Sequence, residues 1–222
     1  MKIKVLTLFP EAYNAMKYGV IGKALENDLF SVEIVNIRDY ATDKHKKCDD
    51  YPYGGGAGMV MLPQPAHDSI THNDPDHTFK RIYLSPKGSV LTQSKVKSLA
   101  KESEILLFNG SYEGIDQRII DMDIDEEISI GDYVLTSGDL ASMVLINAVA
   151  RYIPNVLGSE QSTEEESFSD GLLEYPHYTR PFDFNGVTIP EILISGNHEE
   201  IAKWRKEQSI ALTKKLRPDL LK

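Results

Sequence analysis

Short apolar runs recur along the first two thirds of the chain, and stretches with helical periodicity separate several of them. We predict strands at Lys2–Phe9, Val32–Ile37, Arg81–Ser85, Ile105–Phe108 and Glu127–Ile130. We predict helices at Pro10–Asn27, Lys95–Glu102 and Leu140–Tyr152, and a long polar loop over Arg38–Gly58. Apolar strands separated by helices are typical of parallel sheets covered on both faces. The pattern therefore predicts an α/β fold with a mostly parallel sheet.

The pattern changes between Asn155 and Tyr175, where the sequence becomes polar and acidic without any periodicity. Such a composition is typical of a linker. Beyond it, Ile189–Ser195 and the helical stretch Glu199–Lys215 form a smaller unit. We therefore predict an α/β domain at residues 1–160, a flexible linker at 161–175 and a small helical C-terminal domain at 176–222.

Composition limits the class of protein further. The chain of 222 residues is 41% hydrophobic and 26% charged, and no apolar run reaches the length of a membrane span. The first residues predict a strand, not a signal peptide, so we expect a cytoplasmic protein without a membrane anchor. A single cysteine, Cys48, excludes an internal disulfide and a cysteine-rich zinc site, and we expect an inert thiol.

Charge is distributed unevenly. The net charge of −10 argues against indiscriminate nucleic-acid binding. Residues 201–222, in contrast, carry seven Lys and Arg residues against Glu207 and Asp219. This basic end could hold RNA through one localised face, or it could be an ordinary solvated helix surface. Charge alone leaves both interpretations open.

Glycine-bearing loops follow three of the predicted strands, at Leu84–Gly88, Asn109–Asp116 and Ile130–Leu135. Ligands of α/β sheets collect at the carboxyl ends of strands, so we expect these loops to converge on a pocket. Within Glu127–Pro154, the bends at Gly131 and Gly138 precede a helix and leave backbone polar groups available to a flat, nucleotide-like ligand. Another glycine cluster, Tyr53–Met59, fits neither a phosphate-binding loop nor a dinucleotide fingerprint, so a tight turn and a ligand-contacting loop both remain open.

Several motifs in order carry a specific resemblance: YGGGAGM, LSPKG, GSYEGID, EISIGDYVLTSGDL and HYTRP. With LFPE at Leu8–Glu11 and LRPDLL at Leu216–Leu221, the chain resembles the bacterial tRNA (guanine-N1)-methyltransferase family TrmD, of the SPOUT class, over almost its whole length. The resemblance implies a deep trefoil knot, which patterning alone would not predict. It also implies a homodimer with active sites shared between subunits. The implied reaction transfers a methyl group from S-adenosylmethionine to N1 of guanosine 37, next to the anticodon of tRNA.

The resemblance also implies which residues form the site. It places S-adenosylmethionine against Leu84, Ser85, Pro86, Gly110, Tyr112, Glu113, Ile130, Gly131, Tyr133, Leu135 and Gly138. Asp170 resembles the general base that removes the N1 proton, and a carboxylate taken into a closed site has a raised proton affinity. Arg151 resembles the cation that stabilises charge on guanine O6. Without the resemblance, Asp170 would be a solvated linker acid and Arg151 a helix-terminal residue bonded to carbonyls.

Other polar residues allow two interpretations each. His177, Tyr178 and Arg180 either shape the region after the linker or contact a base or phosphate. His45, Asp49 and Asp50 either contact substrate or anchor their loop. The residues themselves predict no metal site, although the family resemblance allows a Mg²⁺ ion that assists the base.

The chain departs from the family pattern at Ser111, Ser137, Asp139 and Ala141. We expect strain at Ser137 if its loop requires a positive φ. Two alternatives to the implied function remain. One is a related SPOUT enzyme that methylates another RNA atom and needs no base at Asp170. The other is a binding-only descendant, disabled at Ser111 and Ser137.

Overall fold

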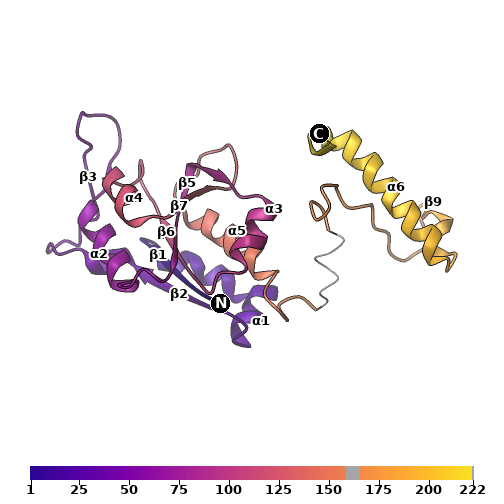
Figure 1. Cartoon of the computed structure of the whole chain (residues 1–222), viewed down its shortest axis with the longest axis horizontal. Coiled ribbons are helices and arrows are strands. Elements are labelled where there is room, and N and C mark those ends of the chain that lie inside the picture. The colour runs from indigo at the N-terminus through magenta and orange to yellow at the C-terminus, as the bar shows by residue number, and fades with distance from the viewer. Residues whose placement is uncertain (159–165, 222) are drawn as a thin grey trace. The chain divides into compact units, whose positions relative to one another are not determined.

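The chain folds into two compact units, residues 1–158 and 159–222. The computed structural model describes residues 1–158 and 166–221 (Figure 1). Within the described residues, no helix combines the length and apolarity that a membrane crossing requires. The first unit contains the large sheet, and the second contains one long helix.

The sheet of the first unit has five parallel strands in the order β2-β1-β6-β5-β7. The strands are β1 (Lys2–Thr7), β2 (Ser31–Asn36), β5 (Lys80–Val90), β6 (Glu104–Asn109) and β7 (Glu126–Ser129). The predicted α/β fold with a mostly parallel sheet is therefore confirmed. The inner strands have apolar residues on both faces because helices cover both sides.

Helices form a layer on each face of this sheet (Figure 1). One layer contains α1 (Gly19–Glu26), α3 (Gln93–Leu99) and α5 (Asp139–Ala150), which share a core with Ile3, Val5, Ile105 and Leu107. The other contains α2 (Pro63–Asn73) and α4 (Gln117–Asp123), which share a core with the alternate strand residues Leu6, Leu106 and Phe108. Successive strand residues point to opposite faces, so each inner strand contributes to both cores. Each fully buried side chain of this kind stabilises the fold by about 1.5–3 kcal/mol.

The predicted single helix at Pro10–Asn27 is wrong, because the segment divides into two elements. A 3-10 helix, η1 (Pro10–Lys17), is followed by α1, which begins at Gly19. Tyr18 is extended and Gly19 has a φ of 66°, a conformation that glycine adopts without strain. This change of direction brings Tyr13 from η1 and Ile21 from α1 into the same core.

The predicted polar loop after β2 contains more structure than its composition indicated. It includes η2 (Ile37–Tyr40) and β3 (Asp49–Asp50), which pairs antiparallel with β4 (Val60–Met61). Asp43 accepts hydrogen bonds from the backbone N–H groups of His45 and Lys47, and the side chain of Asp50 accepts one from Tyr51. These contacts favour the loop-anchoring interpretation of this region. Cys48 is buried beneath it, and burial raises the pKa of its thiol.

The second unit is built around α6 (His198–Leu216), which Asn197 caps by accepting a hydrogen bond from the backbone N–H of Glu200. Its other elements are the hairpin β8 (Asp183–Phe184) and β9 (Val187–Thr188), and the 3-10 helices η4 (Glu191–Ile194) and η5 (Pro218–Leu221). Residues 161–165 of the predicted linker lie outside the described residues. The part of the linker that is described contacts α6, where the Leu173 N–H donates to Thr213 Oγ1 at 2.9 Å.

Candidate active site

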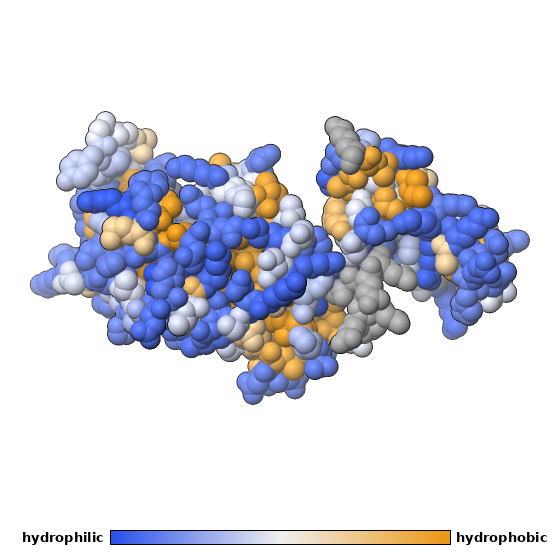
Figure 2. Space-filling view, in the orientation of Figure 1, coloured by the Kyte–Doolittle hydropathy of each residue, from blue (hydrophilic) through white to orange (hydrophobic). Residues whose placement is uncertain are grey.

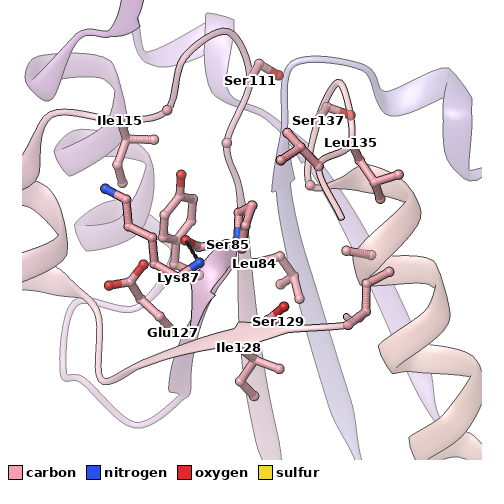
Figure 3. A pocket seen from close by; sticks show the side chains of 18 of the residues that line it. Leu84, Ser85, Lys87, Ser111, Ile115, Glu127, Ile128, Ser129, Leu135 and Ser137 are labelled. Carbon is pink, nitrogen blue, oxygen red and sulfur yellow. Dashed lines mark hydrogen bonds between the residues drawn. The ribbon is translucent and has the colours of Figure 1, made fainter. Parts of the chain in front are cut away.

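The three glycine-bearing loops converge at the carboxyl edge of the sheet, around a cavity of about 280 Å³ (Figure 3). Every residue that the family resemblance places against a cofactor lines this one cavity: Leu84, Ser85, Pro86, Gly110, Tyr112, Glu113, Ile130, Gly131, Tyr133, Leu135 and Gly138. The first loop interrupts β5, and the other two follow β6 and β7; the three strands are neighbours in the sheet. The expectation that the loops meet is therefore confirmed, while their ligand remains a prediction.

One wall of the cavity is formed by an interruption of strand pairing within β5. Leu84 and Ser89 both pair with Ile128 of β7, so the four residues between them leave the ladder and line the cavity, apart from Gly88. Gly88 is required where the chain returns, because a Cβ atom there would lie 2.4 Å from the backbone of Glu127. The bulge thus turns Ser85 and Pro86 toward the cavity.

The loops after β6 and β7 are bonded to each other. The Gly138 N–H donates to the Gly110 carbonyl at 2.9 Å, and Ser111 and Ser137 form an isolated antiparallel bridge. A Cβ atom on Gly110 would lie 2.6 Å from the Tyr83 hydroxyl, whose ring is buried. The cavity wall at Gly110 therefore has no room for a side chain.

A buried carboxylate holds this wall in place from behind. Asp139, at the start of α5, is 4% exposed, and its Oδ1 atom accepts hydrogen bonds from Thr7 Oγ1 at 2.6 Å, Asn109 Nδ2 at 3.0 Å and Tyr13 Oη at 3.2 Å. Its Oδ2 atom accepts one from Ser137 Oγ at 2.7 Å. Burial, and then the negative charge of Asp139, raise the pKa of the Tyr13 hydroxyl, so that group remains a donor. The network joins β1, η1, the end of β6 and the loop after β7.

The expected strain at Ser137 is absent. Ser137 is not among the described residues with a positive φ, and its hydroxyl is satisfied by Asp139. Gly138 has a φ of −72°, which any residue can adopt. What favours glycine at 138 is proximity, because a Cβ atom would lie 3.1 Å from the Cα of Asn109.

The structure adds polar residues to the site that the sequence reasoning missed. Lys87 and Glu127 lie on the wall opposite Leu135 and Ser137 (Figure 3). Glu127 Oε2 is buried and has no hydrogen-bond partner among the described residues. Burial, and then the charge of Glu127, raise the pKa of Tyr83 to about 12. Lys87 and Glu127 belong to the quoted motifs LSPKG and EISIG, so their position beside the strand ends was the available signal.

Arg151, in contrast, does not line the cavity of its own chain. Gly138 and Ala141 at the start of α5 contact the cavity, whereas Arg151 caps the other end of that helix. Twelve helical residues separate the ends by roughly 18 Å, which is more than an arginine side chain spans. Within one chain, therefore, α5 carries Arg151 away from the cavity.

Asp170 belongs to the second unit, where its carboxylate is exposed and accepts a hydrogen bond from Lys206 Nζ at 2.6 Å. This contact with Lys206 holds the pKa of Asp170 below its usual range. The expected raised proton affinity is not found in this state, because the carboxylate remains in water. Across residues 1–158 and 166–221, no three His, Cys, Asp or Glu side chains are grouped as a metal site.

Comparison with known proteins points to one family. The sequence matches the family described as tRNA (Guanine-1)-methyltransferase TrmD over residues 1–222. A protein of Alkaliphilus metalliredigens named tRNA (guanine-N(1)-)-methyltransferase is 56% identical over 230 residues, covering 100% of this chain and 92% of that protein. Proteins of the same name from Clostridioides difficile and Clostridium perfringens are 52% and 53% identical, covering 98% and 93% of their own lengths and 100% and 99% of this chain.

Proposed function

The chain belongs to the tRNA (guanine-1)-methyltransferase TrmD family, and from this premise we propose its complete reaction. It is a tRNA (guanine-N1)-methyltransferase, as its relatives over the full length are. We propose that the methyl donor is S-adenosylmethionine and that the target is guanosine 37, next to the anticodon. The observation that carries the proposal is the convergence of eleven family-matched residues on one cavity.

The chemistry of the cavity fits S-adenosylmethionine. Gly110 and Gly138 place no side chain between the backbone and the ligand space, so a flat ring can approach this wall closely. Val134 and Leu135, which line the cavity and are exposed, supply apolar surface. The buried Oε2 atom of Glu127 is an acceptor that lacks a donor, and the ribose hydroxyls or the amino group of the ligand would supply one. When bound there, S-adenosylmethionine supplies an electrophilic methyl group.

We propose that two residues outside the cavity, Asp170 and Arg151, act on the guanine. Neutral guanine carries a proton on N1, so N1 becomes nucleophilic only when a base removes that proton. We assign this role to Asp170, whose carboxylate accepts the proton as the N1–methyl bond forms. Electron density then increases on O6, and we assign Arg151 to stabilise it there. In this proposal Asp170 must first leave Lys206, because that contact stabilises the carboxylate without its proton.

We propose that the chain acts as a homodimer with a trefoil-knotted core. Helix α5 is apolar on nearly all sides, and Leu140 and Val144, one turn apart, are 59% and 47% exposed. Tyr18 and Val20 add exposed apolar surface near α1, where Figure 2 also shows apolar residues gathered. Surfaces of this kind mark subunit contacts. The position of Arg151 supports sharing, because it cannot reach the cavity of its own chain along α5.

If two subunits share each active site, two variants that are inactive alone should complement each other in a heterodimer. Gly110→Val fills the cavity wall, and Arg151→Ala removes the proposed O6 contact. Each variant alone should be inactive as a homodimer. If cavity and arginine come from different subunits, a heterodimer contains one intact site. Re-associated equal mixtures should then recover about a quarter of wild-type activity, as random pairing of subunits gives. Recovery at background level would contradict sharing.

A single methyl group on the cavity wall should weaken cofactor binding. The Cβ atom of Gly110→Ala would meet the Tyr83 side chain, which is buried and cannot move aside freely. Overpacking typically costs about 1–3 kcal/mol, so we expect S-adenosylmethionine to bind about five- to hundredfold more weakly in calorimetry. Gly158→Ala is the matched control, because its Cβ atom meets nothing within 4 Å. Equal affinity in both variants would argue against Gly110 as part of the cofactor site.

The reaction is tested with radiolabelled S-adenosylmethionine and tRNA transcripts that carry or lack guanosine 37. We expect incorporation only into the transcript with the guanosine, and 1-methylguanosine as the modified nucleoside after digestion. Another methylated nucleoside would favour a SPOUT enzyme acting on a different RNA atom. Absence of both cofactor binding and incorporation would favour the binding-only alternative.

A further inference from the structure

A second cavity, of about 380 Å³, lies entirely within the second unit. Its walls include Tyr175, His177, Tyr178, His198, Trp204 and Arg205, which come from the segment before the hairpin and from α6. The reaction proposed above assigns no role to this cavity. It is lined mainly by aromatic and basic side chains, an unusual combination for a structural void.

The rings on its walls are tilted, so they do not cover one another face to face. Tyr175 and His177 have centroids 4.9 Å apart at 48°, and Tyr178 and Trp204 have centroids 6.4 Å apart at 52°. The guanidinium of Arg205 lies 4.7 Å from the Tyr175 ring centroid. Tyr178 is 49% exposed, which is more than a ring that only fills a core would be. The cavity therefore presents aromatic surface that is available to a flat ligand.

The ligand that matches these walls is a nucleobase. Proteins that bind single-stranded RNA stack bases on Tyr, Trp and His rings and on arginine planes, and basic residues nearby hold the backbone. Beside the cavity, α6 carries the basic residues Lys203, Arg205 and Lys206, together with Glu199 and Glu200 in its first turn. A second protein chain is a poorer match, because His177, His198 and Arg205 would lose contact with water on an apolar surface.

We propose that this cavity holds one unpaired base of the substrate tRNA, outside the site of methyl transfer. The inference rests on tRNA being the substrate, and it adds a second point of attachment to that substrate. Tyr178 and Trp204 provide the stacking surface, and Tyr175 with Arg205 forms the facing wall.

Trp204 allows a direct test, because it is the only tryptophan in the chain. Titration of the full-length protein with an unmodified tRNA transcript should quench its fluorescence, since a base stacks beside the indole ring. Tyr178→Ala should weaken tRNA binding about five- to hundredfold, the usual range for loss of one base–aromatic stack. Tyr178→Phe keeps the ring and should bind within about twofold of wild type. Phe184→Ala is the matched control, because Phe184 is exposed in the same unit and does not line the cavity.

The melting temperature of each variant, measured beside its tRNA affinity, separates a loss of folding from a loss of binding. If Tyr178→Ala lowers the melting temperature, His177→Ala carries the test, because its side chain is 63% exposed and its removal leaves no void. Unchanged tRNA affinity in His177→Ala and Tyr178→Ala would overturn the proposal. So would a Trp204 signal that follows protein concentration, which would indicate a second copy of the chain in the cavity. If the variants bind tRNA normally and methylate it at the wild-type rate, the base-binding role of this cavity is wrong, whereas the proposed methylation reaction still holds.

Discussion

Asp170→Asn is expected to lower kcat by about two to four orders of magnitude, the usual contribution of a general base. Asparagine keeps the shape of the side chain but cannot accept the N1 proton. Asp170 belongs to the second unit and does not line the cavity, so binding of S-adenosylmethionine should stay unchanged in calorimetry. Single-turnover methylation of tRNA measures the effect on the chemical step. A variant with near-normal turnover would remove Asp170 from the mechanism.

The pH dependence tests the same residue independently. Lys206 lowers the pKa of Asp170 in the described state, so the free enzyme holds the base deprotonated down to unusually acidic pH. Lys206→Met removes the cation, the pKa of Asp170 rises toward its ordinary value, and the acidic limb of kcat/KM should move to higher pH. The pH profile of kcat reports the enzyme–substrate complex. Its acidic limb should stay where it is in Lys206→Met if Asp170 no longer contacts Lys206 in that complex. Glu207→Gln, an exposed acid on the same helix, is the control and should change neither profile.

The sheet and the meeting of the loops could be predicted because both depend on local signals. Apolar runs of strand length alternate with helical periodicity, and parallel strands place their carboxyl ends at one edge. The break at Gly19 could not be predicted in the same way. Both halves of Pro10–Asn27 have acceptable helical composition, and only packing of Tyr13 and Ile21 on one core decides that the chain turns.

The polar details of the site depend on tertiary contacts that no local pattern records. In β5, Leu84 and Ser89 both pair with Ile128 of β7, and the residues between them form a bulge. This bulge brings Lys87 beside the cavity. Glu127 lies in a strand, where the sequence alone predicts that a carboxylate is exposed to water. In the structure its Oε2 atom is buried, and only the tertiary contacts around it show this. Arg151 and Asp170 are proposed through family resemblance alone. The distance of Arg151 from the cavity of its own chain follows from the length of α5.

Two departures from the family pattern contact each other in the structure. Ser137 and Asp139 both differ from the usual residues, and taken singly Ser137 predicted strain in the cavity wall. In the structure the Ser137 hydroxyl donates to Asp139 Oδ2 at 2.7 Å, so the two substitutions form one contact.

Asp139→Ala should consequently be the most destabilising of the substitutions considered. It removes the acceptor for Thr7, Tyr13, Asn109 and Ser137 at once, and each buried donor left unsatisfied costs about 1–3 kcal/mol before relaxation. Because the four groups relax together and water enters in part, we expect a loss of about 3–5 kcal/mol in the free energy of unfolding. Urea denaturation followed by circular dichroism measures it.

Asp139→Asn keeps the volume of the side chain and an acceptor at Oδ1, and it removes the negative charge. The amide oxygen can still accept at the Oδ1 position, and the amide nitrogen can donate to the Ser137 hydroxyl, which reverses one bond instead of deleting it. We expect less than half of the destabilisation of Asp139→Ala and nearly normal binding of S-adenosylmethionine. Since Ser137 and Gly138 lie on the cavity wall, Asp139→Ala should also weaken cofactor binding under conditions where it remains folded. Equal loss of stability in the two variants would show that the negative charge, which both remove, holds the wall, and not the Oδ1 acceptor or the volume that asparagine keeps.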